Sequence, residues 1–142
     1  MRIFLAACLS LLLSNPVFAE QKYSSGDLDI HYIVFNSSFL QPNVAKASGL
    51  ERSKNVAILN VSLVRNGQGE KANVQGNMTN LLGQTRTLSF KEIDEGNAVY
   101  YIAQFPIDGR EMMRFALNIT DAENTRHTIN FSQEVFPDPW NP

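Results

Sequence analysis

Apolar and polar residues alternate with a period of two along most of the chain after residue 27. In the first such stretch, Leu28, Ile30 and Val34 share one face, while Asp29 and His31 lie on the other. This alternation predicts β-strands that bury one face. The pattern recurs at a spacing close to that of a β-sandwich. The segments that have it are residues 28–35, 59–64, 72–78, 87–91, 99–105, 113–119 and 128–135.

These segments predict an all-β fold, a sandwich of two antiparallel sheets with about seven strands in total. Residues 99–105 are apolar on both faces, which indicates a strand in the interior of its sheet. Turn sequences separate the segments, and Asn66-Gly67 readily supplies the positive φ of a hairpin turn. We expect Leu81, Leu82 and Gly83 to lie in a connection that crosses between the sheets.

One helical signal stands out, in the connection of residues 36–54. Pro42 is favoured at the first position of a helix and Gly49 at its end, so one or two helical turns are expected between them. The apolar residues expected to hold this short helix over one end of the sandwich are Phe39, Leu40, Val44 and Ala47.

The first 19 residues have the pattern of a secretory signal peptide. Arg2 precedes an apolar stretch of about eleven residues, Pro16 ends it, and Val17-Phe18-Ala19 fits a signal-peptidase site. We therefore expect cleavage between Ala19 and Glu20, which leaves residues 20–142 as a single domain. Two other interpretations compete with this one. The stretch is short for a membrane anchor, which needs about 20 apolar residues. A lipobox ending at Cys8 is disfavoured because the apolar run continues beyond it.

Composition narrows the class of protein further. The chain has 142 residues, 18% of them charged, and a formal net charge of -2. It is therefore not basic, as a nucleic-acid binder usually is, and it has no apolar run of about 18 residues that could span a membrane. Removal of the signal peptide also removes Cys8, the only cysteine, so the exported chain forms no disulfide.

Catalytic chemistry has little support in the residues. The only histidines are His31 and His127, both expected at exposed or edge positions, and no Gly-x-Ser-x-Gly sequence is present. The carboxylate pair Asp27 and Asp29 shares one strand face but has no neighbour that specifies a substrate. We expect no catalytic residues and no enzyme activity, with a hydrolase as the remote alternative.

A copper site is the metal chemistry that an exported β-sandwich suggests. Copper(I) prefers thioether or thiolate sulfur together with imidazole. His31 and His127 are weak candidates, and they would need to approach one point. The adjacent Met112 and Met113 point to opposite faces of their strand, which makes Met113 a core residue. We therefore predict no metal and no cofactor.

The longest non-strand stretch, residues 36–54, is the best candidate for recognition, because loops carry function more often than strands do. It is interpreted either as a structural cap or as a recognition loop. The C-terminal tail has three prolines and the only tryptophan, which either packs back on the domain or is offered to a partner. The candidate binding residues are Phe39, Leu40, Gln41, Arg52, Lys54 and Trp140.

The same stretch resembles a known family. The sequence Phe39-Leu40-Gln41-Pro42-Asn43-Val44-Ala45, the following Arg52-Ser53-Lys54 and the later Met113-Arg114-Phe115 look like the exported proteobacterial family called domain of unknown function 4426. The resemblance covers nearly all of residues 20–142. It implies a periplasmic, immunoglobulin-like sandwich, and it carries over no catalytic residues.

The sequence thus predicts a periplasmic, non-enzymatic binding or protein-interaction module. Its partner is expected to be another envelope protein, reached through residues 36–54 or through a sheet edge. No nucleic-acid partner and no membrane-spanning segment are expected. The alternative is a periplasmic accessory protein that binds a small ligand or copper.

Overall fold

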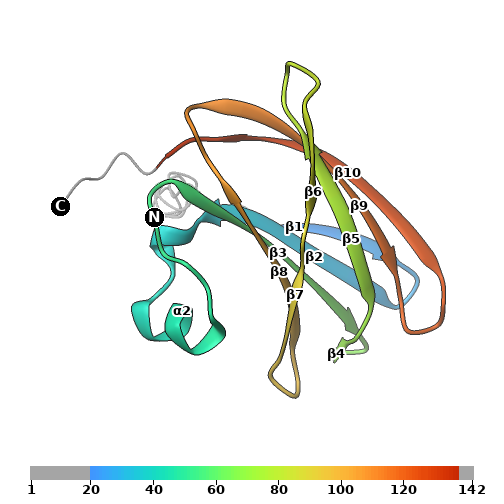
Figure 1. Cartoon of the computed structure of the whole chain (residues 1–142). Coiled ribbons are helices and arrows are strands. Elements are labelled where there is room, and N and C mark those ends of the chain that lie inside the picture. The colour runs from blue at the N-terminus through green and yellow to red at the C-terminus, as the bar shows by residue number, and fades with distance from the viewer. Residues whose placement is uncertain (1–19, 138–142) are drawn as a thin grey trace, which may run out of the picture.

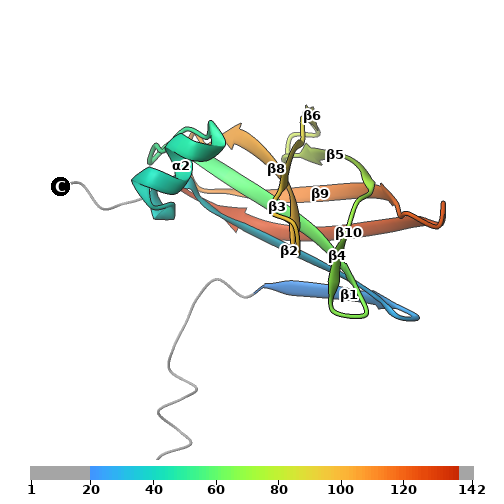
Figure 2. The same cartoon turned by 90° about the horizontal axis from the view of Figure 1, so that it is seen from below.

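A computed structural model describes residues 20–137 as two antiparallel sheets packed face to face (Figures 1 and 2). One sheet has the strand order β1-β2-β3-β8-β7, with β4 pairing on β3, and the other has the order β10-β9-β5-β6. The strands are β1 (Gln21–Ser25), β2 (Leu28–Asn36), β3 (Val56–Arg65), β4 (Gln68–Glu70), β5 (Asn73–Thr79), β6 (Thr85–Leu88), β7 (Lys91–Asp94), β8 (Val99–Pro106), β9 (Glu111–Thr120) and β10 (Arg126–Val135).

The predicted antiparallel β-sandwich is confirmed. The described part of the chain has ten strands where the sequence predicted about seven. The additional strands β1, β4 and β7 are short, and they lie at a sheet edge or off the main path. Such strands need no continuous apolar face, so their alternation is weak. The interior position predicted for residues 99–105 is also confirmed, because β8 lies between β3 and β7.

The predicted crossing at Leu81-Leu82-Gly83 is wrong. These residues form the tip of the hairpin between β5 and β6, two neighbours in one sheet. The chain changes sheets later, at residues 89–90 between β6 and β7. Gly83, with φ of 82°, completes a tight turn that the leucines around it obscured in the sequence.

The core lies between the two sheets and consists of the inward-facing residues of each strand. The Phe105 and Phe115 rings, from opposite sheets, lie 5.7 Å apart, and Phe115 stacks on Phe131 at 4.9 Å. Met113 is only 5% exposed, which confirms its predicted place in the core. Residues 20–137 contain no cysteine, so no disulfide supports this part of the chain and burial of the core stabilises it.

The predicted short helix is confirmed, but the side chains expected to hold it over the sandwich are not buried: Phe39 is 58% and Val44 44% exposed, and the buried helix residue is Ala45. A 3-10 turn, η1 (Ser37–Phe39), and a helix, α2 (Pro42–Ser48), follow β2. Pro42 stands at the start of α2, and Gly49 ends it with φ of 68°. This is the left-handed conformation that glycine adopts without strain.

The strand register gives the sandwich two different ends. We call one the cap end: here residues 37–55, 80–84 and 107–110 connect the strands. We call the other the ion-pair end: here the connections are residues 26–27, 66–67, 71–72, 95–98 and 121–125. In Figure 1 the cap end carries α2 and the β5–β6 hairpin, and the ion-pair end carries β4 and the turn between β9 and β10.

Candidate functional site

The cap segment, residues 37–53, is fixed internally. The Ser37 hydroxyl donates to the carbonyl of Ser53 and accepts from the N–H of Ser53, each at 2.9 Å, and Ser37 is fully buried. The Arg52 guanidinium donates to the carbonyls of Leu40 at 2.6 Å and Ser38 at 3.1 Å. These bonds satisfy backbone groups that would otherwise lack partners, so they hold the segment in one conformation.

The cap segment is also tied to the sheet below it. The Gln104 amide on β8 donates to the carbonyl of Glu51 and accepts from its N–H. The Lys91 ammonium on β7 donates to the carbonyl of Ser48 at 2.6 Å, close to the C-terminus of α2. A cation there also interacts favourably with the helix dipole. The segment is therefore anchored at several points along its length.

The candidate binding residues separate into two groups. Phe39 is 58% exposed, and Gln41 and Lys54 are exposed as well. Leu40 is half-buried, and Arg52 is engaged in holding the segment. Trp140 lies outside the described residues, so the structure does not place it.

The two histidines lie in different environments. His31 faces away from the core and bonds to Glu20 at 2.8 Å. His127 lies on the edge strand β10, as one of the two predicted positions had it, but it is only 5% exposed, so the predicted exposure is wrong. It lies on the inward face of β10, two residues from buried Ile129, and strand periodicity would have placed it there. The structure does not bring these two side chains to one point.

A network of charged side chains closes the ion-pair end. Arg65 contacts four carboxylates, one from the β1–β2 turn, one from β4 and two from the β9–β10 turn. His127 Nε2 lies 2.8 Å from Asp121 Oδ2. Burial raises the pKa of Asp121, but hydrogen bonds from His127 and two backbone N–H groups outweigh it and hold the pKa below its usual value. Hydrogen bonding to Arg65 likewise lowers the pKa of Glu70. The carboxylates around Arg65 are those of Asp27, Glu70, Asp121 and Glu123.

This network has the appearance of a catalytic relay, but its surroundings differ from those of an active site. The His127 ring meets the Tyr23 ring edge-on at 5.6 Å, and its Nδ1 lies 3.4 Å from the Tyr23 hydroxyl. Both Asp121 and His127 are buried. An active site needs an open space in which a substrate can meet the reacting groups. The arrangement instead ties β1 to the opposite sheet.

The tip of the β5–β6 hairpin presents two leucines to solvent. Leu81 is 77% and Leu82 is 84% exposed. Asn80 holds the turn: its Oδ1 accepts from the N–H groups of Leu82 and Gln84, and its Nδ2 donates to Gln84 Oε1 at 2.7 Å. The Gly83 N–H donates to the Asn80 carbonyl at 3.0 Å. The tip is therefore ordered by its polar groups, and it leaves its apolar groups unburied.

Exposed apolar side chains concentrate at this same end. Within residues 20–137, the large hydrophobic residues that are exposed belong to the cap segment, the β5–β6 tip, the start of β9 or the end of β10. All four places lie at the cap end. These residues are Phe39, Val44, Leu81, Leu82, Met112 and Phe136.

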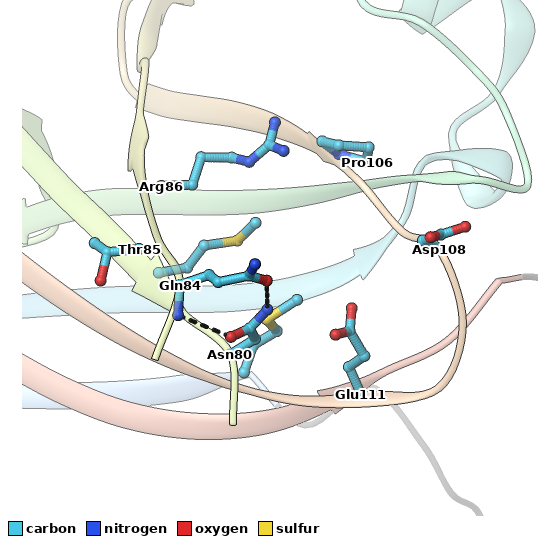
Figure 3. A pocket seen from close by; sticks show the side chains of 9 residues that line it. Asn80, Gln84, Thr85, Arg86, Pro106, Asp108 and Glu111 are labelled. Carbon is cyan, nitrogen blue, oxygen red and sulfur yellow. Dashed lines mark hydrogen bonds between the residues drawn. The ribbon is translucent and has the colours of Figure 1, made fainter. Parts of the chain in front are cut away.

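A cavity of about 400 Å³ opens beside the β5–β6 hairpin (Figure 3). Buried Met78 and Met113 supply apolar side chains to its lining. Arg86 extends from β6 toward Pro106, while Asp108 and Glu111 lie on the side formed by the β8–β9 connection. The remaining lining residues are Asn80, Gln84 and Thr85.

Residues 20–137 contain neither a membrane-spanning helix nor a cluster of metal ligands. No helix there is long and apolar enough to cross a membrane. No group of three or more His, Cys, Asp and Glu side chains in this part of the chain is arranged to hold a metal ion.

The family model described as domain of unknown function (DUF4426) matches residues 22–138. The chain belongs to this family. A crystal structure of a DUF4426 family protein from Pseudomonas aeruginosa PAO1 is 44% identical, with a TM-score of 0.77, and the match covers 84% of this chain and 96% of that one. The predicted resemblance is thereby confirmed. No curated protein matches the chain.

More distant solved structures share the fold. FetP from uropathogenic Escherichia coli strain F11 is 15% identical, with a TM-score of 0.51 over 86% of this chain and 95% of that one. A copper-bound variant of FetP is 12% identical, with a TM-score of 0.52 over 88% and 94% of the two chains. At these identities the likeness concerns the β-sandwich alone.

Proposed function

We propose that this protein is an exported, non-enzymatic interaction module that binds a partner protein of the cell envelope through its cap end. The observation that carries the proposal is the β5–β6 tip, where Leu81 and Leu82 are 77% and 84% exposed on a turn fixed by Asn80. Exposed apolar groups that gather on one part of a surface mark interaction sites.

The rigidity of the tip supports this role. Burying a leucine that was exposed contributes about 1.5–3 kcal/mol, so two leucines supply a substantial part of a binding energy. A turn that is already ordered loses little conformational entropy when it binds. The cap segment is likewise held by its own polar contacts, through Ser37, Arg52 and Gln104.

Export to the periplasm rests on the sequence. Residues 1–19 have the features of a signal peptide, and Glu20 is expected to begin the processed chain. FetP, which shares the fold, was expressed in the periplasm of E. coli. Processing therefore predicts a purified protein whose intact mass corresponds to residues 20–142.

The alternative role is binding of a small ligand or of copper. The structure offers support for a small ligand but not for copper. A cavity of about 400 Å³ lies in the range that holds small molecules. For copper, FetP has a copper-bound variant, but His31 and His127, the two histidines of this chain, lie apart. We therefore do not extend the proposal to copper.

Capture from crosslinked cells tests the interaction role. The double variant Leu81→Ser with Leu82→Ser should lose one dominant envelope partner that the natural protein retains. Both side chains are already exposed, so the change should alter the free energy of unfolding by less than about 0.5 kcal/mol.

The matched control changes two exposed residues at the opposite end, Glu95→Ser with Asn97→Ser. This control should retain the partner. Equal recovery of the partner from both double variants would contradict the proposal, as would loss from the control alone.

A further inference from the structure

We propose that the cavity beside the β5–β6 hairpin binds a short peptide, through its terminal ammonium and terminal carboxylate. The proposal goes beyond the interaction role above, because it concerns a small ligand and residues that lie below the leucine tip. It rests on three features of the lining: charged side chains that no other side chain of residues 20–137 pairs, their opposite signs on separate sides, and two methionines in the same lining.

The strand register places charges where core residues would be expected. Arg86 pairs directly with Met78, whose side chain is buried, so both lie on the inward face of the sheet. Leu88, two residues further along β6, is buried on that face. Glu111 has the same relation to buried Met113 on β9. Alternation thus places both side chains on the inward-facing side at the open end of the sandwich, where Arg86 is exposed and Glu111 is half-buried.

These charges are not neutralised by their neighbours. Within residues 20–137, no salt bridge or side-chain hydrogen bond engages the charged groups of Arg86, Asp108 or Glu111. By contrast, Arg110, in the same connection as Asp108, bonds to Glu134 at 2.7 Å and stacks on Phe136. The three groups lining the cavity therefore remain able to bind a ligand.

The signs are segregated across the cavity. Figure 3 shows Arg86 extending from β6 on one side, and Asp108 and Glu111 on the side of the β8–β9 connection. A guanidinium recognises a carboxylate through paired hydrogen bonds, and carboxylates recognise an ammonium. A ligand that satisfies both sides must carry a cation at one end and an anion at the other.

The lining also includes two methionines beside the polar residues Asn80, Gln84 and Thr85. Met78 and Met113 offer flexible thioether side chains that adapt to ligands of varied shape. The volume of about 400 Å³ is in the range for small ligands. A di- or tripeptide has this combination of terminal ammonium, terminal carboxylate and side chains between them. In a free amino acid the two charges sit on one carbon and cannot separate.

Isothermal titration calorimetry of the processed protein with leucyl-leucine tests the assignment. Leucyl-leucine should bind, and its N-acetyl form and its C-terminal amide should each bind at least tenfold more weakly. Arg86→Gln should weaken binding of leucyl-leucine tenfold or more and leave binding of the amide unchanged. Asp108→Asn with Glu111→Gln should do the same for leucyl-leucine and the N-acetyl form.

The controls separate this inference from the interaction role. The Leu81→Ser, Leu82→Ser variant should bind leucyl-leucine like the natural protein, because neither leucine lines the cavity. Free leucine should bind at least tenfold more weakly than the dipeptide. The inference is overturned if the dipeptide fails to bind at about 10 mM, a very weak affinity. Equal binding by free leucine would overturn it too. So would an affinity that changes neither when the end groups of the peptide are blocked nor when Arg86 or the two carboxylates are replaced.

Discussion

A few polar residues at inward-facing strand positions, or next to a strand end, distinguish the two ends of this sandwich. Asp121 and His127 form a buried pair at one end, and Arg86 and Glu111 line a cavity at the other. Strand periodicity predicts that His127, Arg86 and Glu111 face inward, because each lies two residues from a buried residue of the same strand. Their partners were not predictable, since Arg65, Asp121 and His127 meet only when both sheets are packed together.

At pH 7 the Asp121→Asn variant should lower the melting temperature by roughly 5 °C, because it replaces a buried carboxylate that is hydrogen-bonded to His127, Arg65 and two backbone N–H groups. Folding lowers the pKa of Asp121, so its ionised form stabilises the protein above the ordinary pKa of about 4. This contribution is lost as the pH falls through the lower pKa of the folded state. The melting temperatures of variant and natural protein should therefore converge toward pH 3.

Thermal unfolding followed by circular dichroism between pH 3 and pH 7 makes this measurement. Glu95→Gln is the control, because Glu95 is an exposed turn residue, and its melting temperature should follow that of the natural protein. A difference between Asp121→Asn and the natural protein that stays constant down to pH 3 would contradict the assigned role.

Among the elements, the cap segment was predicted well and the β5–β6 hairpin was not. Pro42 and Gly49 are local signals, and the helix between them forms where they indicate. In the hairpin, the turn residues Asn80 and Gly83 enclose two leucines, and this apolar pair led to the prediction of a crossing connection. Consecutive leucines usually indicate burial. Their exposure arises because the hairpin extends beyond the sandwich (Figure 1), and the local sequence pattern does not predict this.

Because of the way the cap segment is anchored, we expect Arg52 and Lys54 to contribute differently to the free energy of unfolding. Arg52→Ala should lower the free energy of unfolding by about 1 kcal/mol, because it removes hydrogen bonds to the carbonyls of Leu40 and Ser38. It should also speed hydrogen exchange in residues 37–53. Lys54→Ala should change the free energy of unfolding by less than about 0.5 kcal/mol, because Lys54 is exposed and makes no such bond in the described structure.

Denaturant unfolding and hydrogen-exchange mass spectrometry check both variants. Equal protection of residues 37–53 in the natural protein and the Arg52→Ala variant would show that the guanidinium does not hold the segment. If Lys54→Ala loosened the segment as much, charge in general and not the bonds of Arg52 would be responsible.

At the scale of the whole molecule, the two ends of the sandwich differ in chemistry. The ion-pair end gathers Arg65 and its carboxylates, and the cap end gathers the exposed hydrophobic residues and the cavity. Alternation along the chain predicts the sandwich because the apolar residues of each strand show which of its faces is buried. It does not predict this segregation, since the connections at one end come from distant parts of the sequence and are brought together by the strand register.

The cap end, through the β5–β6 tip, is the surface that we propose meets a partner. Photo-crosslinking in intact cells tests this central claim most directly, with a benzoylphenylalanine placed at Leu82 or, as a control at the ion-pair end, at Asn97. We expect one dominant crosslinked species from position 82 and none from position 97. A crosslink of equal or greater yield from position 97, or none from position 82, would contradict the claim.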